Sequence, residues 1–402
     1  MRQTLQIEDA PQALGLDAAR LARIRLNLSR YVDDGQLPGW LVLLSRRGRI
    51  AYLDTYGWRD REAGLPIDGG TQFRIYSMTK PITSVAALIC YEQGAFDLTD
   101  PVSRFIPAFA DMRVWQGGSA EAPLTAPAEE PIRLWHLLTH TAGLTYGVES
   151  HPVDALYRAQ MQKAVSEDWD LAAVCDRLAQ FPLLFEPGTD WHYSMATDVL
   201  GRVVEVVSGR PLDQFLADEI FTPLGMRATG FWVPESERPQ LAALYRRDPD
   251  RNRAVRDDVT GARVATPHAF LSGGGGLVST AGDYYRFMRM LLGEGELDGT
   301  RVLGSRTVRF MTRNHLPAPL SLASFGQPGV GFGLGVAVQQ DPVAHRSPEN
   351  PGAYGWGGVA STDFWVDPRE QLAVLFLTQL IPSGSYPLRP RLRQLVYQAL
   401  VD

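Results

Sequence analysis

The feature that most constrains the fold is a change of hydrophobic pattern along the chain. Short apolar runs typical of strands lie towards the two ends, whereas the middle alternates helical patterns with loops rich in Pro and Gly. Strands at both ends with helices inserted between them indicate that the two terminal segments build one sheet. The sequence therefore predicts an α+β fold of the α/β sandwich type, with an antiparallel sheet flanked by helices and an inserted, mainly helical domain.

The first hundred residues carry the clearest of these patterns. Apolar residues at helical spacing predict a first helix over 17–35, with Gly35 as its stop. The apolar runs 40–44 and 50–56 surround a short polar turn and predict a hairpin. Around residue 77 the period becomes helical again and continues to Gly94, which predicts a buried helix of about four turns.

After residue 95 the hydrophobic pattern predicts helices first and strands again near the C-terminus. Helices are expected in the middle of the chain at 132–138, 153–161, 170–179, 197–207 and 212–220, and two stretches of weak pattern or high charge, 116–130 and 246–258, are expected to be surface loops. Four glycines, 273–276, precede another helix, and the final segments predict strands at 332–338, 355–366 and 372–377 and a helix at 390–400. The predicted division is an α/β domain of residues 1–95 and 270–402 and a mainly helical domain of 96–269, with the active site in the cleft between them.

Composition excludes several classes of protein. With 402 residues, a hydrophobic fraction of 45% and a charged fraction of 21%, the chain has the composition of an ordinary globular protein. Its net charge of -6 and the absence of any basic cluster beyond Arg pairs argue against nucleic acid as a partner. No apolar run is long enough for a membrane span or a secretory signal, and two cysteines are too few for a disulfide framework. We therefore expect a reduced, cytoplasmic protein; the oligomeric state stays open.

Lysine is nearly absent from this chain, and one of the two lysines occupies a chemically special position. Of the 39 Lys and Arg residues only Lys80 and Lys163 are lysine, so arginine supplies almost all of the positively charged side chains. Lys80 stands three residues after Ser77, on the same face of the predicted helix. Lys163 lies in a polar helical stretch without such a partner, and we interpret it as a surface residue.

The Ser-x-x-Lys spacing predicts a nucleophile and its base. A serine hydroxyl attacks well only if a base takes its proton. Lysine can be that base only if its pKa falls, and burial and the positive end of the helix dipole both act in that direction. Arginine cannot replace it because the guanidinium stays protonated. By itself the spacing between Ser77 and Lys80 is weak, because a helix N-terminus with an incidental lysine has the same appearance.

Two further segments strengthen the prediction. Tyr193 follows a turn and precedes a helix, a position from which its hydroxyl can reach a cleft and hold or relay a proton beside Lys80. The segment 355–359, Gly-Trp-Gly-Gly-Val, places glycines inside a strand pattern, which marks a bulge or a close approach to the backbone. An oxyanion hole on a strand edge needs this kind of exposed backbone N–H group.

The order of these segments resembles the serine-reactive penicillin-recognising enzymes, which comprise class C β-lactamases, DD-peptidases and family VIII carboxylesterases. The family's Ser-x-x-Lys motif matches Ser77 and Lys80, its Tyr-x-Asn motif matches partly at 193–195, and its Lys-Thr-Gly motif is replaced by Trp-Gly-Gly at 356–358. The segments 137–144 and 277–280 also resemble recurrent parts of the family, so the likeness covers nearly the whole chain.

The departures from the motifs favour the esterase branch. Trp356 has no charge where the family's lysine faces a substrate carboxylate, and Met195 removes a polar contact for an amide side chain. The resemblance then implies a small-molecule substrate, a short-chain neutral ester, with Ser77 as nucleophile and Lys80 and Tyr193 as joint base and acid. It also implies an oxyanion hole from the backbone N–H groups of Ser77 and Val359. The residues expected to line the substrate site are Trp356, Gly357, Gly358, Tyr146 and Trp191.

Other interpretations stay open. A β-lactamase or DD-peptidase is disfavoured by Trp356 and by the lack of an export signal, whereas acyl transfer to an alcohol is compatible with every motif. A non-catalytic binding protein would not need Ser77, Lys80 and Tyr193 together. His136 and His140 stand four apart but lack a third ligand nearby, so we predict no metal and no cofactor. No Gly-x-Ser-x-Gly pentapeptide of an α/β-hydrolase occurs, and the four-glycine run is expected to be a place of close backbone packing beside the sheet.

Overall fold

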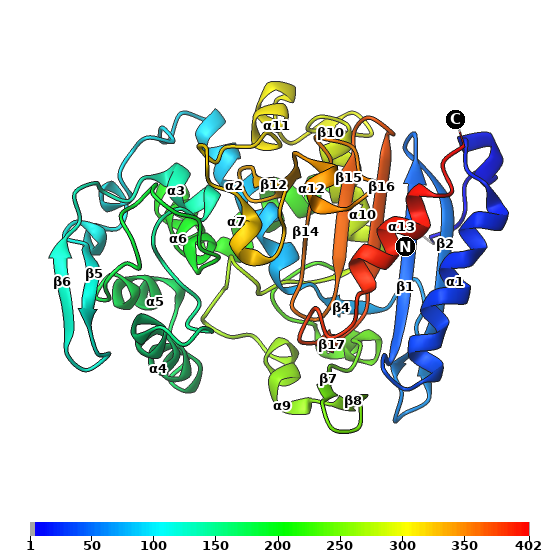
Figure 1. Ribbon diagram of the computed structural model, residues 1–402, viewed down its shortest axis with the longest axis horizontal. Coiled ribbons are helices and arrows are strands. Elements are labelled where there is room, and N and C mark those ends of the chain that lie inside the picture. Colours follow the sequence, from blue (N-terminus) through cyan, green and yellow to red (C-terminus); the bar gives the residue numbers. More distant parts are fainter. Residues whose placement is uncertain (1–4, 402) are drawn as a thin grey trace.

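An eight-stranded antiparallel sheet forms the centre of the computed structural model, which describes residues 5–401 (Figure 1). In spatial order its strands are β12 (Val330–Phe332), β13 (Ala337–Gln339), β14 (Tyr354–Gly357), β15 (Asp363–Asp367), β16 (Leu372–Leu377), β1 (Gly39–Arg46), β2 (Arg49–Asp60) and β3 (Leu65–Pro66). The N-terminal and C-terminal parts meet where β1 pairs with β16, from Leu41 opposite Leu377 to Arg46 opposite Leu372. The predicted α+β class, with a sheet built from both ends of the chain, is confirmed.

Helices cover both faces of this sheet because its central strand is apolar on both sides. All eight residues of β1 are buried, and successive side chains of a strand point to opposite faces. Val42 and Leu44 join the core formed with α1 (Ala18–Asp33) and α13 (Leu388–Tyr397). Leu41 and Leu43 join the larger core that contains α2 (Thr79–Glu92) and α10 (Ala281–Leu292).

The middle of the chain is mainly helical, as predicted, and lies at the end of the molecule away from α1 (Figure 1). Its principal helices are α3 (Leu134–Thr139), α4 (Pro152–Ser166), α5 (Leu171–Leu178), α6 (Ala196–Ser208) and α7 (Leu212–Leu216), the last followed by a π-helical turn, Ala217–Phe221. Helix α2 packs against both the sheet core and α6. The residues that begin α2 therefore lie between the sheet and the helices.

Shorter elements complete the described part of the chain. The helices are α8 (Thr222–Leu224), α9 (Asp258–Gly261), α11 (Ser305–Met311) and α12 (Pro342–His345), and the small sheets pair β4 (Gln72–Arg74) with β9 (Val278–Thr280), β5 (Arg113–Gly118) with β6 (Pro123–Pro127), β10 (Glu296–Leu297) with β11 (Thr300–Arg301), and β7 (Tyr245–Asp248) with both β8 (Arg253–Arg256) and β17 (Leu380–Ile381). Among the helices of residues 5–401, none has the length and apolar character that a membrane crossing requires.

Two sequence predictions are corrected by these small sheets. The segments 116–130 and 246–258 were expected to be loops, but each forms part of a hairpin, β5–β6 and β7–β8. Their strands lack an apolar alternation because most of their residues are exposed or half-buried, so periodicity gives no signal. The long strand patterns 332–338 and 355–366 are likewise each divided into two antiparallel strands by a turn.

Candidate active site

Ser77 lies in a tight turn immediately before α2. The turn is a 3₁₀ helix, Tyr76–Met78, and α2 begins only at Thr79, so Ser77 precedes the α-helix that was expected to start with it. Tyr76 has a φ of 45°, a left-handed conformation that is rare for a residue with a side chain. Such local strain persists only where the surroundings enforce it, and it is often found beside reactive groups.

The Lys80 amine is fully enclosed and has three polar neighbours. The residue has an exposed fraction of 0%, which confirms the predicted burial. Its Nζ lies 3.3 Å from Ser77 Oγ, 2.7 Å from Tyr146 Oη and 2.6 Å from the carbonyl oxygen of Gly274. It also lies 4.6 Å from the centroid of the Tyr193 ring. Ser77 and Lys80 therefore meet as the spacing predicted.

A buried carboxylate organises the far side of this amine. Asp198, in the first turn of α6, accepts hydrogen bonds from Ser272 Oγ at 2.6 Å and from the Gly274 backbone N–H at 3.0 Å. Burial raises the pKa of Asp198, while the nearby charge of Lys80 and these hydrogen bonds act in the opposite direction. Asp198 thus holds the backbone of Gly274, whose carbonyl oxygen accepts a hydrogen bond from the Lys80 amine.

The four-glycine run, residues 273–276, packs closely against the residues around the Lys80 amine. A Cβ on Gly274 would come within 2.5 Å of Asp198 Oδ2 and 2.8 Å of Tyr146 Oη. The predicted backbone crowding is present, but at Gly274 it brings the chain against the lysine site. Sequence reasoning missed Asp198, Ser272 and Gly274. The available signal was an aspartate inside the apolar pattern that opens α6.

Tyr146 and Tyr193 flank the amine from one side, with ring centroids 5.1 Å apart. The hydroxyl of Tyr146, and not that of Tyr193, contacts Lys80 directly. Burial raises the pKa of Tyr146 well above its usual value, and the neighbouring Tyr193 and Asp198 act in the same direction. Tyr146 therefore keeps its proton at neutral pH, and its oxygen accepts the Lys80 N–H.

Trp356 holds Tyr193 in place. Its indole Nε1–H donates to Tyr193 Oη at 3.2 Å, so this donor is directed at the tyrosine. The indole is also stacked on Phe325, with an interplanar angle of 15°. Trp356 thus forms an apolar wall and orients the hydroxyl of Tyr193, whose ring lies over the Lys80 amine.

Gly358, the second glycine after Trp356, allows the end of β14 to lie against the nucleophile segment. A Cβ on Gly358 would lie 2.5 Å from the carbonyl oxygen of Ile75 and would also clash with Thr362 Oγ1. After Gly358 the chain turns, and the Gly358 carbonyl accepts the Ser361 N–H at 3.1 Å. Val359, the next residue, is 43% exposed and lies on the cavity wall.

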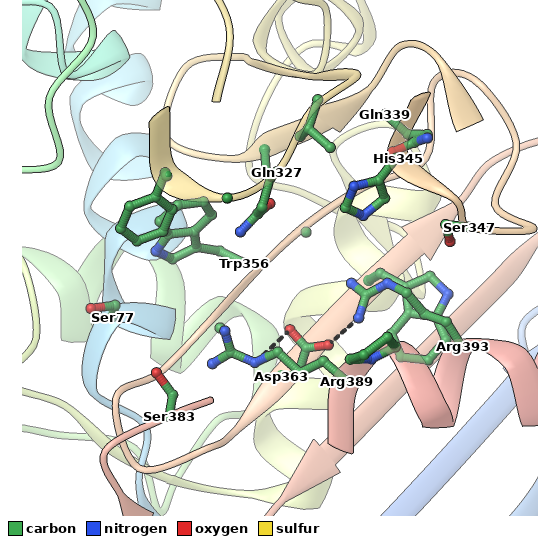
Figure 2. Close-up of a pocket in the computed structure, with 18 of the residues that line it drawn as sticks. Ser77, Gln327, Gln339, His345, Ser347, Trp356, Asp363, Ser383, Arg389 and Arg393 are labelled. Carbon is green, nitrogen blue, oxygen red and sulfur yellow. Dashed lines mark hydrogen bonds and ion pairs between the residues drawn. The ribbon is translucent and has the colours of Figure 1, made fainter. Parts of the chain in front are cut away.

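These residues open into a cavity of about 1520 Å³. Most of the residues predicted to form the site line it, namely Ser77, Tyr146, Tyr193, Trp356, Gly357, Gly358 and Val359. Figure 2 shows the cavity running from Ser77 past Trp356 towards the charged group of Asp363, Arg389 and Arg393. Lys80 is enclosed behind Ser77.

Trp191 requires a correction. We expected it to line the substrate site, but it is buried behind the wall, between Tyr193 and Phe332, with an exposed fraction of 4%. Its ring lies 5.5 Å from that of Phe325, which does line the cavity. The sequence offers no means of telling the inner aromatic layer from the outer one, because both consist of aromatic residues near Tyr193.

His136 and His140, which stand four residues apart in the sequence, have separate surroundings. His136 accepts the Arg133 backbone N–H at Nδ1 and so caps α3. His140 ends that helix, with its Nδ1 lying 3.3 Å from Ser194 Oγ and its ring packed on Tyr193. Across the residues that the structure describes, no group of three or more His, Cys, Asp or Glu side chains is arranged to hold a metal ion.

Together, the α+β fold and the contact between Ser77 and the enclosed Lys80 amine point to the class of serine hydrolases. The family model described as Beta-lactamase matches residues 24–398. The chain is 38% identical to Protein Rv1367c of Mycobacterium tuberculosis, covering 89% of this chain and 90% of that protein. It is 34% identical to Esterase EstB of Burkholderia gladioli, with coverages of 96% and 98%.

A solved structure extends the likeness to three dimensions. The structure titled EstCE1, a hydrolase with promiscuous acyltransferase activity, superposes with a TM-score of 0.81 at 30% identity, covering 94% of this chain and 99% of that one. The chain belongs to the β-lactamase family, within its family VIII esterases, and is a serine hydrolase.

Proposed function

We propose that the protein hydrolyses short-chain, neutral carboxylic esters through an acyl-enzyme on Ser77. One observation carries the proposal: the enclosed Lys80 amine has two good acceptors, Tyr146 Oη at 2.7 Å and the Gly274 carbonyl at 2.6 Å, and a third neighbour, Ser77 Oγ, at 3.3 Å. A neutral amine has two hydrogens and one lone pair. If the neutral amine donates both hydrogens to these two acceptors, its lone pair is left for the third neighbour, Ser77 Oγ.

The acylation step follows from this arrangement. Lys80 Nζ takes the Ser77 proton as Oγ forms a bond to the ester carbonyl carbon. The negative charge that develops on the carbonyl oxygen is met by the backbone N–H groups of Ser77 and Val359. The bond to the alkoxy group then breaks, and Tyr193 passes a proton to the departing alkoxide while the Ser77 proton stays on Lys80.

Deacylation uses the same groups in reverse. A water molecule attacks the acyl carbon and gives a proton to Tyr193, and Lys80 returns its proton to Ser77 Oγ as the acyl bond breaks. Tyr146 keeps its own proton because its pKa is raised. We therefore assign it the role of holding the Lys80 amine.

The wall of the cavity supports a neutral acyl or alcohol group beside Ser77. Trp356, Phe325 and Tyr193 form a continuous aromatic surface, with ring centroids 5.2 to 6.1 Å apart, and an apolar group gains free energy by covering such a surface. The cavity volume of about 1520 Å³ exceeds the roughly 300–1,000 Å³ of an ordinary ligand pocket. Short-chain esters therefore fit with space to spare, and a larger alcohol is also accommodated.

Acyl transfer to an alcohol is the second candidate. The printed title of the EstCE1 structure attributes promiscuous acyltransferase activity to that protein. The large cavity beside Ser77 supports the same possibility here, since an alcohol that occupies it would compete with water for the acyl-enzyme. Adding increasing amounts of a primary alcohol to the ester assay separates the two reactions by their products, an acid or a new ester.

The roles of Ser77 and Lys80 are tested with a short-chain p-nitrophenyl ester. Ser77→Ala removes the nucleophile, and Lys80→Arg replaces the base with a group that stays protonated. We expect each to lower kcat by at least about 100-fold, the lower range for general acid–base catalysis. The chain supplies its own control, Lys163→Arg, because Lys163 is the other lysine and is exposed on α4.

The outcome is decisive in both directions. A Lys80→Arg enzyme with nearly the wild-type rate would remove Lys80 from its role as base. A fluorophosphonate should label Ser77 in stoichiometric amount, and absence of labelling in the folded protein would contradict the nucleophile. A panel of p-nitrophenyl esters of increasing chain length, run beside a chromogenic cephalosporin, separates the esterase from the β-lactamase alternative.

We also propose two broader properties. Residues 96–269 are proposed to act as a unit against residues 1–95 and 270–402, with the Ser77 cavity at the junction; limited proteolysis that releases fragments at these boundaries would support this. A cytoplasmic location is supported by the two cysteines, Cys90 and Cys175, which are both free and buried. Fractionation of the producing cells tests it.

A further inference from the structure

Arg389 lies beneath the strand that carries the proposed oxyanion hole. It is the second residue of α13, and its guanidinium points towards the end of β14 (Figure 2). Nη2 donates to the Gly358 carbonyl at 2.8 Å and to the Thr362 carbonyl at 3.0 Å. A Cβ on Gly357 would clash with the guanidinium. One glycine of the Gly-Gly pair thus makes room for this side chain, and the other makes room for the nucleophile segment.

The Gly358 carbonyl and the Val359 N–H belong to the same planar peptide unit. In a trans peptide these two groups point in opposite directions, so the position of the oxygen fixes the direction of the hydrogen. The oxygen closes a turn by accepting the Ser361 N–H at 3.1 Å, which directs it into the turn and the Val359 N–H outward. Arg389 adds a second, charged hydrogen bond to this oxygen.

A charged donor changes the peptide in two ways. It restrains the plane, because rotation of the peptide would break the bond to Arg389. It also polarises the amide, because hydrogen bonds in series strengthen one another. Both effects favour the same result, an N–H held towards the position where negative charge develops, and a fixed donor needs no reorganisation during the reaction.

We propose that Arg389 is a positioning residue for catalysis, which orients and polarises the Gly358–Val359 peptide so that the Val359 N–H stabilises the oxyanion. This inference rests on the proposed function, because it takes the Val359 N–H as one of the two oxyanion donors. Asp363 assists by holding the guanidinium from the other side, with Arg389 Nε 3.7 Å from Oδ1.

Arg389 is not needed to dock its helix on the sheet. Arg393, one turn later on α13, makes the stronger contacts: Nη1 lies 2.6 Å from Asp363 Oδ2, and Nε lies 2.7 Å from Glu349 Oε1. Leu392 and Val396 of the same helix are buried in the core. Loss of the Arg389 side chain should therefore leave the fold in place and act on the peptide it holds.

The test compares a transition-state mimic with a ground-state mimic. An alkyl trifluoromethyl ketone forms a tetrahedral adduct with a serine and places an oxyanion in the hole, whereas the corresponding carbinol has no electrophilic carbonyl. The variants are Arg389→Ala, Arg389→Lys and Arg306→Ala. Arg306 lies on α11 and is exposed, so its variant controls for the loss of an arginine. The readouts are kcat and KM for p-nitrophenyl acetate and the affinity for each inhibitor.

Removal of a whole oxyanion donor costs roughly 100- to 1,000-fold in kcat. Arg389→Ala leaves the N–H present but less well held, so we expect a smaller loss of about 10- to 30-fold in kcat with KM nearly unchanged. Affinity for the trifluoromethyl ketone should fall by the same factor, while affinity for the carbinol stays the same. Arg389→Lys should recover part of the loss, because it keeps the charge, and Arg306→Ala should match the wild type.

Three outcomes would overturn the inference. These are an unchanged kcat in Arg389→Ala, an equal loss of affinity for both inhibitors, or, if the alanine variant does not fold, an Arg389→Lys enzyme whose trifluoromethyl ketone affinity is unaltered. Ser77→Ala separates this failure from failure of the proposed function. If Ser77→Ala is inactive while Arg389→Ala is fully active, only the role of Arg389 is refuted; if Ser77→Ala retains activity, the proposed function itself is wrong.

Discussion

Protonation of the buried His136 should contribute to a sensitivity of this protein to mild acid. His136 is 4% exposed, and its Nδ1 accepts the Arg133 backbone N–H at the start of α3. Burial lowers the pKa of His136 from its usual 6.5 to about 4, and the nearby charge of Arg133 acts in the same direction. Protonation would also place a hydrogen on the atom that accepts the helix cap.

The sign and size of the effect follow from linkage. The folded pKa lies below the unfolded value, so the unfolded chain binds the proton more readily, and stability is lost as the pH falls from 6.5 towards 4. The full effect is ~3 kcal/mol, since one pKa unit corresponds to about 1.4 kcal/mol. At about pH 5 the loss amounts to ~2 kcal/mol, a large part of the roughly 5–15 kcal/mol that stabilises a typical domain.

The assay is urea unfolding at several pH values between about 7.5 and 4.5, for the wild type and for His136→Asn. The asparagine oxygen can accept the Arg133 N–H but does not titrate, so the variant should lose ~2 kcal/mol less than the wild type at about pH 5. His140, whose pKa is also lowered by burial, contributes equally to both proteins. His268→Asn, at a half-buried loop position, controls for loss of an imidazole. Identical pH profiles for the wild type and His136→Asn would refute the reasoning.

The remaining predictions concern the groups around Ser77. Tyr146→Phe removes an acceptor of the Lys80 amine, which becomes charged as it takes the Ser77 proton. We expect kcat to fall about 10- to 100-fold with KM little changed, since a hydrogen bond to a charged group contributes about 1.5–3 kcal/mol; an enzyme within twofold of the wild type would contradict this role. Gly358→Ala forces a Cβ to within 2.5 Å of the Ile75 carbonyl. Because a misplacement of about 1 Å can cost 100-fold, we expect kcat to fall by about that factor; the reasoning fails if crystals of the variant show an unmoved turn and activity is retained.

Much of the sheet was predictable from the sequence, because its pattern is local. The apolar runs of β1 and β2 and the short polar turn between them specify the hairpin, and the return of strand patterns near the C-terminus specifies its partners. The hairpins β5–β6 and β7–β8 were not predictable, because their exposed strands bury too little apolar surface to leave a period. Their pairing is decided by neighbours far along the chain, such as β17 for β7.

The residues of the site also fall into two groups, those placed by local spacing and those brought together by tertiary packing. Ser77 and Lys80 share one helical turn, so their approach is fixed by a spacing of three residues, and the scarcity of lysine adds weight to that pair. Asp198, Gly274 and Tyr146 lie between 66 and 194 residues from Lys80 in the chain. No local pattern connects them, and only the packing of α6 and the glycine run against α2 brings them to the same amine.

The sequence by itself determined the chemistry that requires particular residue types at short spacing: a serine beside a lysine that arginine cannot replace, a tyrosine on a rigid turn, and glycines that permit close backbone approach. Tertiary structure decided which atoms face one another. In the folded protein the Trp356 N–H donates to Tyr193, and the side chain of Trp191 is buried. Tyr146 is the tyrosine whose hydroxyl contacts Lys80, and Arg389 donates to the Gly358 carbonyl. The physical reason is that hydrogen bonds depend on distances of a few tenths of an ångström, and in this site those distances are set by segments that are remote in sequence.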